Sequence, residues 1–187
     1  MNDSIRQYVA TGKKIRVERS RPSNPRLNGF LIDVSESLGL MHCFHDFMPD
    51  GFSVFRIADV TGVRSGKYER HWERMLKGEG LLPTLATRPS LDLATMRSAI
   101  DSIRSQYNRI IIECEDAEDE CEDFYIGSVL SSNEDTVAIQ HFDGLGIWED
   151  EPSIITLSDI SLLQFDTPYI NTFWKYLAER PAPKNNA

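Results

Sequence analysis

Phe30-Leu-Ile-Asp-Val34 decides how this sequence is interpreted, because it recurs downstream as Tyr125-Ile-Gly-Ser-Val129. Similar segments at a fixed spacing indicate an internal repeat. The flanking segments recur in the same order about 95 to 101 residues later: Ile15-Arg-Val-Glu18 as Ile110-Ile-Ile-Glu113, and Ile57-Ala-Asp-Val60 as Leu157-Ser-Asp-Ile160. The repeat predicts two related units in one chain.

The repeat divides the 187 residues into two units with a linker between them. We expect a first unit at 1–80, a linker at 81–89, a second unit at 90–178 and a disordered tail at 179–187. Segments rich in β-branched and aromatic residues alternate with turn sequences, which indicates five short strands per unit. The expected strands are 14–20, 28–35, 38–47, 52–58 and 60–65, then 109–115, 123–131, 135–142, 146–148 with 153–157, and 160–165.

Helices are expected at both ends of each unit. Gly12 can end a first short helix, and Ser90 and Asn108 are the expected N-cap and stop of a second. Residues at helical spacing mark this second helix and two short closing ones: Leu93, Met96, Ile100, Ile103 and Tyr107; Tyr68, Trp72 and Leu76; Tyr169, Phe173 and Leu177. We interpret the closing stripes as packing for a barrel end or for the seam between the units.

The predicted fold class is mainly β with short helices. A flat five-stranded sheet would leave two unpaired edge strands and one solvent-exposed face. A sheet that curls into a barrel removes the open edges and buries that face. We therefore expect a tandem duplication of a five-stranded small barrel of the SH3 type. Each copy would have an N-terminal helix and a C-terminal helical turn.

Charge differs sharply between the two units. The formal net charge is −9, but residues 1–90 hold 14 Lys and Arg against 10 Asp and Glu, and residues 91–187 hold 6 against 19. The first unit is thus +4 and the second is −13. A phosphate backbone is compatible with the first unit only, and the second favours a basic partner, a cation or water.

Oppositely charged segments occupy corresponding places, at the turn between the first two strands of each unit. The run Glu113–Asp123 holds eight carboxylates in eleven residues. Like charges of this density are typical of a solvated loop, and docking of one chain's basic loop on another's acidic loop is the alternative. The candidate partner-binding residues are Arg16, Arg19, Arg21 and Arg26, with Glu115, Asp116, Glu118, Asp119 and Glu120.

Chemistry at a catalytic or metal centre is not indicated. The sequence lacks a nucleophile elbow, a phosphate loop and a zinc-protease motif, so we expect no enzyme, no cofactor and no small-molecule substrate. Cys43, with His42 and His45, has no standard zinc-ligand spacing and favours core packing. Three cysteines, no apolar leader and no membrane-length apolar run predict a cytoplasmic protein that does not enter a membrane.

The segments Gly12-x-x-Ile15-x-Val17 and Gly29-Phe-Leu-Ile-Asp33 are similar to the first motif of the Sm-like small barrels of RNA-associated ring proteins. Family members that bind uridine-rich RNA carry an Asp and an Asn after the second strand and an Arg-Gly pair before the last. The turn here is Ser35-Glu-Ser-Leu-Gly39, and the last strands are entered by Ile57-Ala-Asp-Val60 and Leu157-Ser-Asp-Ile160. Neither pair is present, so the resemblance implies the fold without that RNA pocket.

Two functions follow as hypotheses. The first is a non-enzymatic interaction protein that binds itself or a protein partner through charged loops and barrel edges, giving a ring or a filament if copies join head to tail. An immunity or antitoxin protein is one version of it. The alternative is RNA binding through the basic first unit and its exposed aromatic residues.

Overall fold

The computed structural model describes residues 2–21, 24–82, 88–115 and 122–177, and these form a mainly β structure with short helices. The predicted linker is partly described, and the predicted tail, residues 179–187, lies outside the described residues. The first half contains α1 (Asn2–Thr11), β1 (Lys14–Arg19), β2 (Arg26–Val34), β3 (Leu38–His45), β4 (Met48–Arg56), a 3-10 turn (Ile57–Asp59), β5 (Val60–Arg64) and α2 (Lys67–Gly78). The second contains α3 (Met96–Tyr107), β6 (Ile110–Glu115), β7 (Glu122–Ser132), β8 (Thr136–His141), β9 (Ser153–Thr156), β10 (Leu162–Phe165) and α4 (Pro168–Tyr176).

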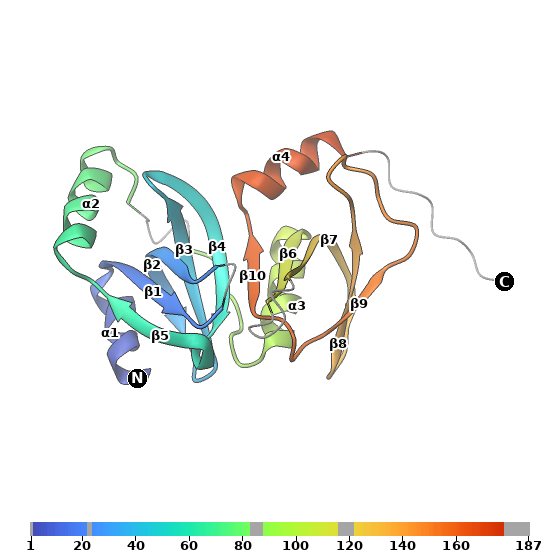
Figure 1. Ribbon diagram of the computed structural model, residues 1–187, viewed down its shortest axis with the longest axis horizontal. Helices are drawn as coiled ribbons and strands as arrows, with labels where there is room; N and C mark the ends of the chain where they lie inside the picture. Colours follow the sequence, from blue (N-terminus) through green and yellow to red (C-terminus); the bar gives the residue numbers. More distant parts are fainter. Residues whose placement is uncertain (1, 22–23, 83–87, 116–121, 178–187) are drawn as a thin grey trace.

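All the described strands belong to one antiparallel sheet, whose order is β5-β1-β2-β3-β4-β10-β6-β7-β8-β9. The two halves therefore join edge to edge, with β4 of the first half beside β10 of the second (Figure 1). Within each half the last strand in sequence lies beside the first, so the order of the first five strands matches that of the last five. The two ends of the sheet are β5 and β9.

Strand register also corresponds between the halves. Ile15 lies opposite Gly29 in the first half, as Ile110 lies opposite Gly127 in the second. Both second strands then shift register at the same point, after Leu31 and after Val129. The sequence alignment of Phe30 with Tyr125 was therefore wrong by three residues. Sixteen residues separate the paired Ile110 and Gly127, against thirteen between Ile15 and Gly29, and an apolar repeat in sequence does not reveal such a difference in hairpin length.

Helix ends follow the capping chemistry of the sequence, with one correction. Gly12 follows α1 with a positive φ of 58°, and Asn108 ends α3 in the left-handed conformation, as expected. Thr95, and not Ser90, is the N-cap of α3, because its hydroxyl accepts a hydrogen bond from the Ser98 N–H. The predicted stripe of α2 has both buried and exposed members: Leu76 is buried against Phe30 and Phe44, whereas Tyr68 is exposed.

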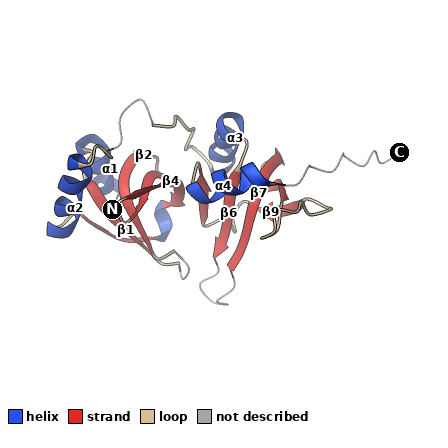
Figure 2. Ribbon diagram, turned by 90° about the horizontal axis from the view of Figure 1, so that it is seen from above, coloured by secondary structure: helices blue, strands red, loops and turns tan. Residues whose placement is uncertain are grey.

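The largest apolar core spans both halves. It joins residues of β3 and β4 to residues of α3 and β10, and Phe52 stacks on Phe165 with their ring centroids 5.3 Å apart. Helix α3 packs on β6, β7 and β10, while α1 and α2 lie on the outer side of the first half (Figure 2). The junction between the halves is thus part of the hydrophobic core. None of the described helices is long and apolar enough to span a bilayer.

Candidate functional site

The junction between the halves is built first by backbone pairing. Strands β4 and β10 pair over four residues, with Val54 opposite Leu163 and Phe55 opposite Leu162. Both Val54 and Leu163 are fully buried. At one end of this pairing, the Arg56 guanidinium of β4 donates hydrogen bonds of 2.7 and 2.6 Å to the carbonyls of Ile160 and Leu157. One half therefore completes the sheet edge of the other.

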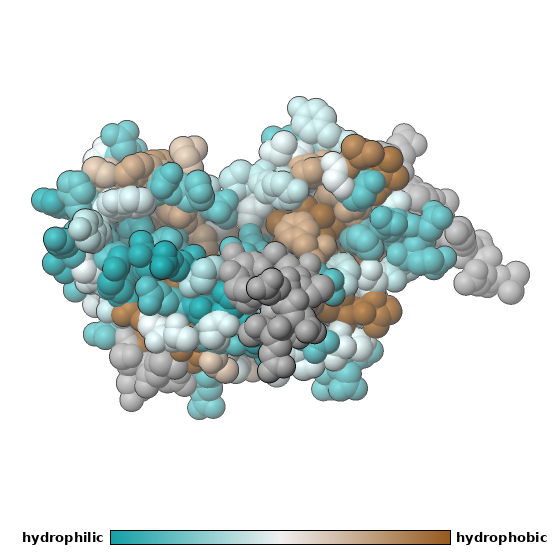
Figure 3. Space-filling view, viewed as in Figure 1, coloured by the Kyte–Doolittle hydropathy of each residue, from teal (hydrophilic) through white to brown (hydrophobic). Residues whose placement is uncertain are grey.

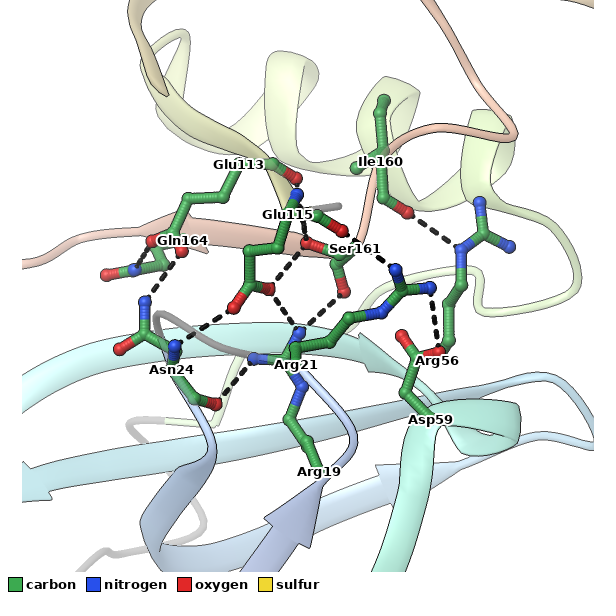
Figure 4. Close-up of polar contacts among 10 residues, drawn as sticks. All are labelled: Arg19, Arg21, Asn24, Arg56, Asp59, Glu113, Glu115, Ile160, Ser161 and Gln164. Atoms are coloured by element: carbon green, nitrogen blue, oxygen red, sulfur yellow. Dashed lines mark hydrogen bonds and ion pairs between the residues drawn. The ribbon is translucent and has the colours of Figure 1, made fainter. Parts of the chain in front are cut away.

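An ion pair closes the junction beside the paired strands. Arg19, at the end of β1, lies 2.6 Å from the Oε2 of Glu115, at the end of β6, and both side chains are 0% exposed. Ser161 donates a hydrogen bond of 2.6 Å to the same carboxylate oxygen. Two buried ionised groups are stable only if most of their remaining hydrogen-bonding capacity is filled. The surrounding groups supply most of it (Figure 4), while the Arg19 Nε has no hydrogen-bond partner among the described residues.

The loop after β1 supplies the remaining contacts. Asn24 donates its backbone N–H to Oε1 of Glu115 at 2.9 Å and its side-chain amide to Glu113 at 2.6 Å. Arg21 donates to the Glu115 carbonyl at 2.8 Å and pairs with Asp59 at 2.9 Å. These groups come from elements about ninety residues apart in sequence, and Figure 4 shows them converging between the halves.

The sequence-predicted residues are separated by this geometry. Arg19, Arg21 and Glu115 meet within a single chain, whereas Arg16 lies on the outer face of the first half and Arg26 is exposed. Asp116, Glu118, Asp119 and Glu120 lie outside the described residues. The sequence did not single out Asn24, Arg56 or Ser161, because polar residues of these types occur on every surface. Docking of Arg19 on Glu115 occurs within the chain, so these two side chains are not free to bind a partner in this structure.

The electrostatics of the junction favour an ionised Glu115. Burial alone would raise the pKa of this carboxyl group, but the Ser161 hydrogen bond, the Arg19 charge and the Asn24 N–H together lower it below the ordinary value. The pKa values of the thiols of Cys43 and Cys114 shift in the opposite direction. Burial raises the pKa of Cys43 to about 12 and that of Cys114 to about 11, which keeps both protonated and unreactive near neutral pH.

Among the described residues, β5 and β9 at the ends of the sheet each pair on one side only, and their other edges correspond to the two edges that meet at the junction. By register, Ile154 of β9 holds the place of Val54 in β4, and Val63 of β5 holds the place of Leu163 in β10. Val54 is 0% exposed and belongs to the core that the two halves share, whereas Ile154 is 66% exposed. An exposed apolar residue on an unpaired edge is a site at which a further strand can add.

Hydrophilic side chains gather over the first half around β1 in Figure 3, while hydrophobic patches lie over parts of the second half. Among the described residues, no group of three His, Cys, Asp or Glu side chains is arranged to hold a metal ion.

Comparison with protein-family models, curated proteins and solved structures finds no match for this chain. The Sm-like resemblance therefore stays a prediction.

Proposed function

We propose that the protein is a non-enzymatic assembly protein made of two copies of one Sm-like small barrel, and that it binds further copies of itself head to tail. In this assembly β9 of one chain pairs with β5 of the next. The observation that carries the proposal is the β4 and β10 pairing, because it joins the same two types of edge within one chain.

The internal junction supplies the register of the proposed contact. Val54 opposite Leu163 becomes Ile154 opposite Val63, and Phe55 opposite Leu162 becomes Ile155 opposite Gly62. Pairing in this register would cover Ile154, which is otherwise an exposed apolar side chain on a free edge. Because the two edges differ, the contact is heterologous, and it gives a ring if the rotation closes and a filament if it does not.

Charge supports the same direction of assembly. Head-to-tail contact places the second half of one chain, with a formal charge of −13, beside the first half of the next, with +4. Complementary fields speed association and disfavour like-to-like docking. The attraction is screened by salt, so we expect assembly to be strongest at low ionic strength.

Sedimentation velocity over a range of protein concentrations tests the proposal. We expect species heavier than the 21.3 kDa chain at low salt, and a shift toward the monomer in Ile154→Lys, since a charge on an edge strand opposes pairing. Leu145→Lys is the matched control, because Leu145 is another exposed apolar residue, in the turn after β8 and away from both edges. A wild-type chain that stays monomeric at high concentration and low salt would contradict the proposal.

A further inference from the structure

A hollow of about 390 Å³ opens on the outer side of the first half, between β1, β2, the end of β5 and the start of α2. Its volume is in the range of pockets that bind small molecules. It is lined by cations, one carboxylate, one amide and two aromatic rings: Lys14, Arg16, Arg64, Glu69, Asn28, Tyr68 and Trp72. The sequence identified only Arg16 of these residues as a candidate binding residue, and it predicted a packing role for Tyr68 and Trp72, because these elements meet only in the fold.

The single lining carboxylate is already engaged. Glu69 accepts a hydrogen bond of 2.8 Å from Arg64 and one of 2.7 Å from the Gly66 N–H at the start of α2. These contacts outweigh burial and lower the pKa of Glu69, so it is ionised and balances the charge of Arg64.

Two cations in the hollow have no such partner. The Lys14 ammonium lies 5.2 Å from the centre of the Trp72 ring, and the Arg16 Nε donates to the Asn28 side chain at 3.1 Å. Among the described residues, neither Lys14 nor Arg16 forms an ion pair with a carboxylate. Burial lowers the pKa of Lys14, which means that its charge is poorly solvated. An anion bound here would relieve that cost.

The second half shows that the fold does not require the charge of Arg16, although it keeps a cation at the place of Lys14, where Arg109 lies 5.7 Å from the centre of the Trp174 ring. By register, Ile111 holds the place of Arg16, Ile126 that of Asn28, and Phe173 that of Trp72. These residues pack with Phe142, Trp148 and Ile170 into an apolar cluster. The places of Arg16 and Asn28 are thus filled by apolar side chains in one half, and border a hollow with an additional cation in the other. A recruited function explains this difference, since packing alone favours the apolar solution.

We propose that this hollow binds a nucleoside phosphate, with the phosphate on Arg16 and Lys14 and the base on the ring of Tyr68. Charge-assisted hydrogen bonds from Arg and Lys are the usual contacts to phosphate. Tyr68 is 61% exposed at the rim of the hollow, and the Lys67 ammonium lies 5.0 Å from the centre of its ring. An exposed aromatic ring beside a cationic groove is a stacking surface for a base. The nucleotide is either free or part of a single-stranded RNA. Arg64 of the hollow belongs to β5, the edge that forms the proposed contact with β9, so binding is tested with that contact blocked.

Isothermal titration with 5′-AMP, adenosine, inorganic phosphate and a single-stranded oligoadenylate tests the proposal. The titrations use the wild-type chain and Ile154→Lys, so that the result does not depend on self-association. We expect 5′-AMP or the oligonucleotide to bind more tightly than adenosine or phosphate alone. Equal affinity for 5′-AMP and oligoadenylate indicates a free nucleotide as ligand, and binding of oligoadenylate alone indicates an RNA strand.

Variants locate the site. Arg16→Ile copies the residue found in the second half, and we expect it to weaken binding about tenfold or more, as for the loss of a hydrogen bond to a charged group. Arg26→Ile removes the same charge from an exposed position outside the hollow and should leave binding within about twofold. Tyr68→Ala should weaken binding, whereas Tyr176→Ala, at an exposed ring of α4, should not. The proposal is overturned if no nucleotide binds, or if Arg16→Ile and Arg26→Ile weaken binding equally.

Discussion

Arg19 and Glu115 are two opposite charges held together without solvent, at the point where the halves meet. The mutual attraction of such a pair only offsets the cost of removing both groups from water. The pair therefore contributes mainly through the penalty for breaking it, since either partner alone is a buried, uncompensated charge. Asn24 and Ser161 limit that cost by filling the remaining hydrogen-bonding positions of the carboxylate.

Arg19→Met should lower the free energy of unfolding by about 3–5 kcal/mol, because it leaves Glu115 buried without its cation. Urea denaturation measures the loss. Arg26→Met, at an exposed position of β2, is the matched control and should change stability by less than about 0.5 kcal/mol. The double variant Arg19→Met, Glu115→Leu should recover much of the loss. Equal stability of Arg19→Met and Arg26→Met would show that the ion pair does not hold the junction.

Glu115 also predicts how stability depends on pH. Its pKa is lower in the folded chain than the ordinary value of 4.5, so between these two pKa values the unfolded chain binds more protons. The stability that Glu115 contributes is present above pH 4.5 and is lost as the pH falls through the lowered value. Glu115→Gln should therefore be less stable than the wild type near neutral pH, with a difference that shrinks in acid. Urea midpoints measured across the acid range check this, and a difference independent of pH would contradict it.

For single residues, the sequence identified the basic group after the first helix and the acidic group that includes Glu115, but it did not predict which of these residues contact each other. Arg16, Arg19, Arg21 and Arg26 form one basic cluster in sequence, yet Arg19 is buried at the junction while Arg16 lines a hollow on the outer side. Alternation along β1 sends neighbouring side chains to opposite faces of the sheet. Which face meets the other half depends on the β4 and β10 pairing, and this is a contact between residues about a hundred positions apart.

Each half contains one glycine at which its second strand closely approaches the third strand. A Cβ built at Gly29 would lie 1.9 Å from the carbonyl oxygen of His42, and one at Gly127 would lie 2.0 Å from that of Gln140. The strands approach each other at these points more closely than any side chain allows. The two glycines hold the same position in the two halves, two residues before the point after which the strand register shifts.

Gly29→Ala and Gly127→Ala should each destabilise the protein by about 1–3 kcal/mol or more, because the added methyl group has to push adjoining strands apart. Thermal unfolding followed by circular dichroism measures both effects. Gly144→Ala adds the same methyl group where no neighbouring atom lies within 4 Å and should be close to neutral. Similar behaviour of all three variants would mean that the close approach is not structurally important.

The elements themselves were largely predictable. Strands expected at 14–20 and 60–65 form at Lys14–Arg19 and Val60–Arg64, because their β-branched residues and flanking turns are local signals. The start of α3 was wrong, since Ser90 and Thr95 are equally good caps in isolation and only the fold selects between them. The open ends of the sheet were not predictable, because an edge is a property of strand order.

On the scale of the whole molecule, the two halves share one core. Residues of β3 and β4 pack with α3 and β10, so neither half can unfold without exposing the apolar surface of the other. Structures that share a core in this way usually unfold in a single transition. The hydrophobic junction and the ion pair thus act together to make the chain one cooperative unit.

Unfolding of the Trp72→Phe variant in urea tests this cooperativity. The remaining tryptophans, Trp148 and Trp174, report only on the second half, whereas far-ultraviolet circular dichroism reports on both. The two probes should give the same midpoint, because the shared core couples the halves. Two separate midpoints would show that the halves unfold independently.

Head-to-tail assembly through β5 and β9 can be tested by mixing two variants that each block one of these edges. Ile154→Lys blocks β9 and leaves β5 intact, whereas Val63→Lys blocks β5 and leaves β9 intact. Each variant alone should be monomeric, and the mixture should form a discrete one-to-one dimer by sedimentation, joined by the one intact pair of edges. A mixture that stays monomeric while the wild type associates would contradict the β5 and β9 pairing. So would a Val63→Lys variant that dimerises alone, because it would show a symmetric contact.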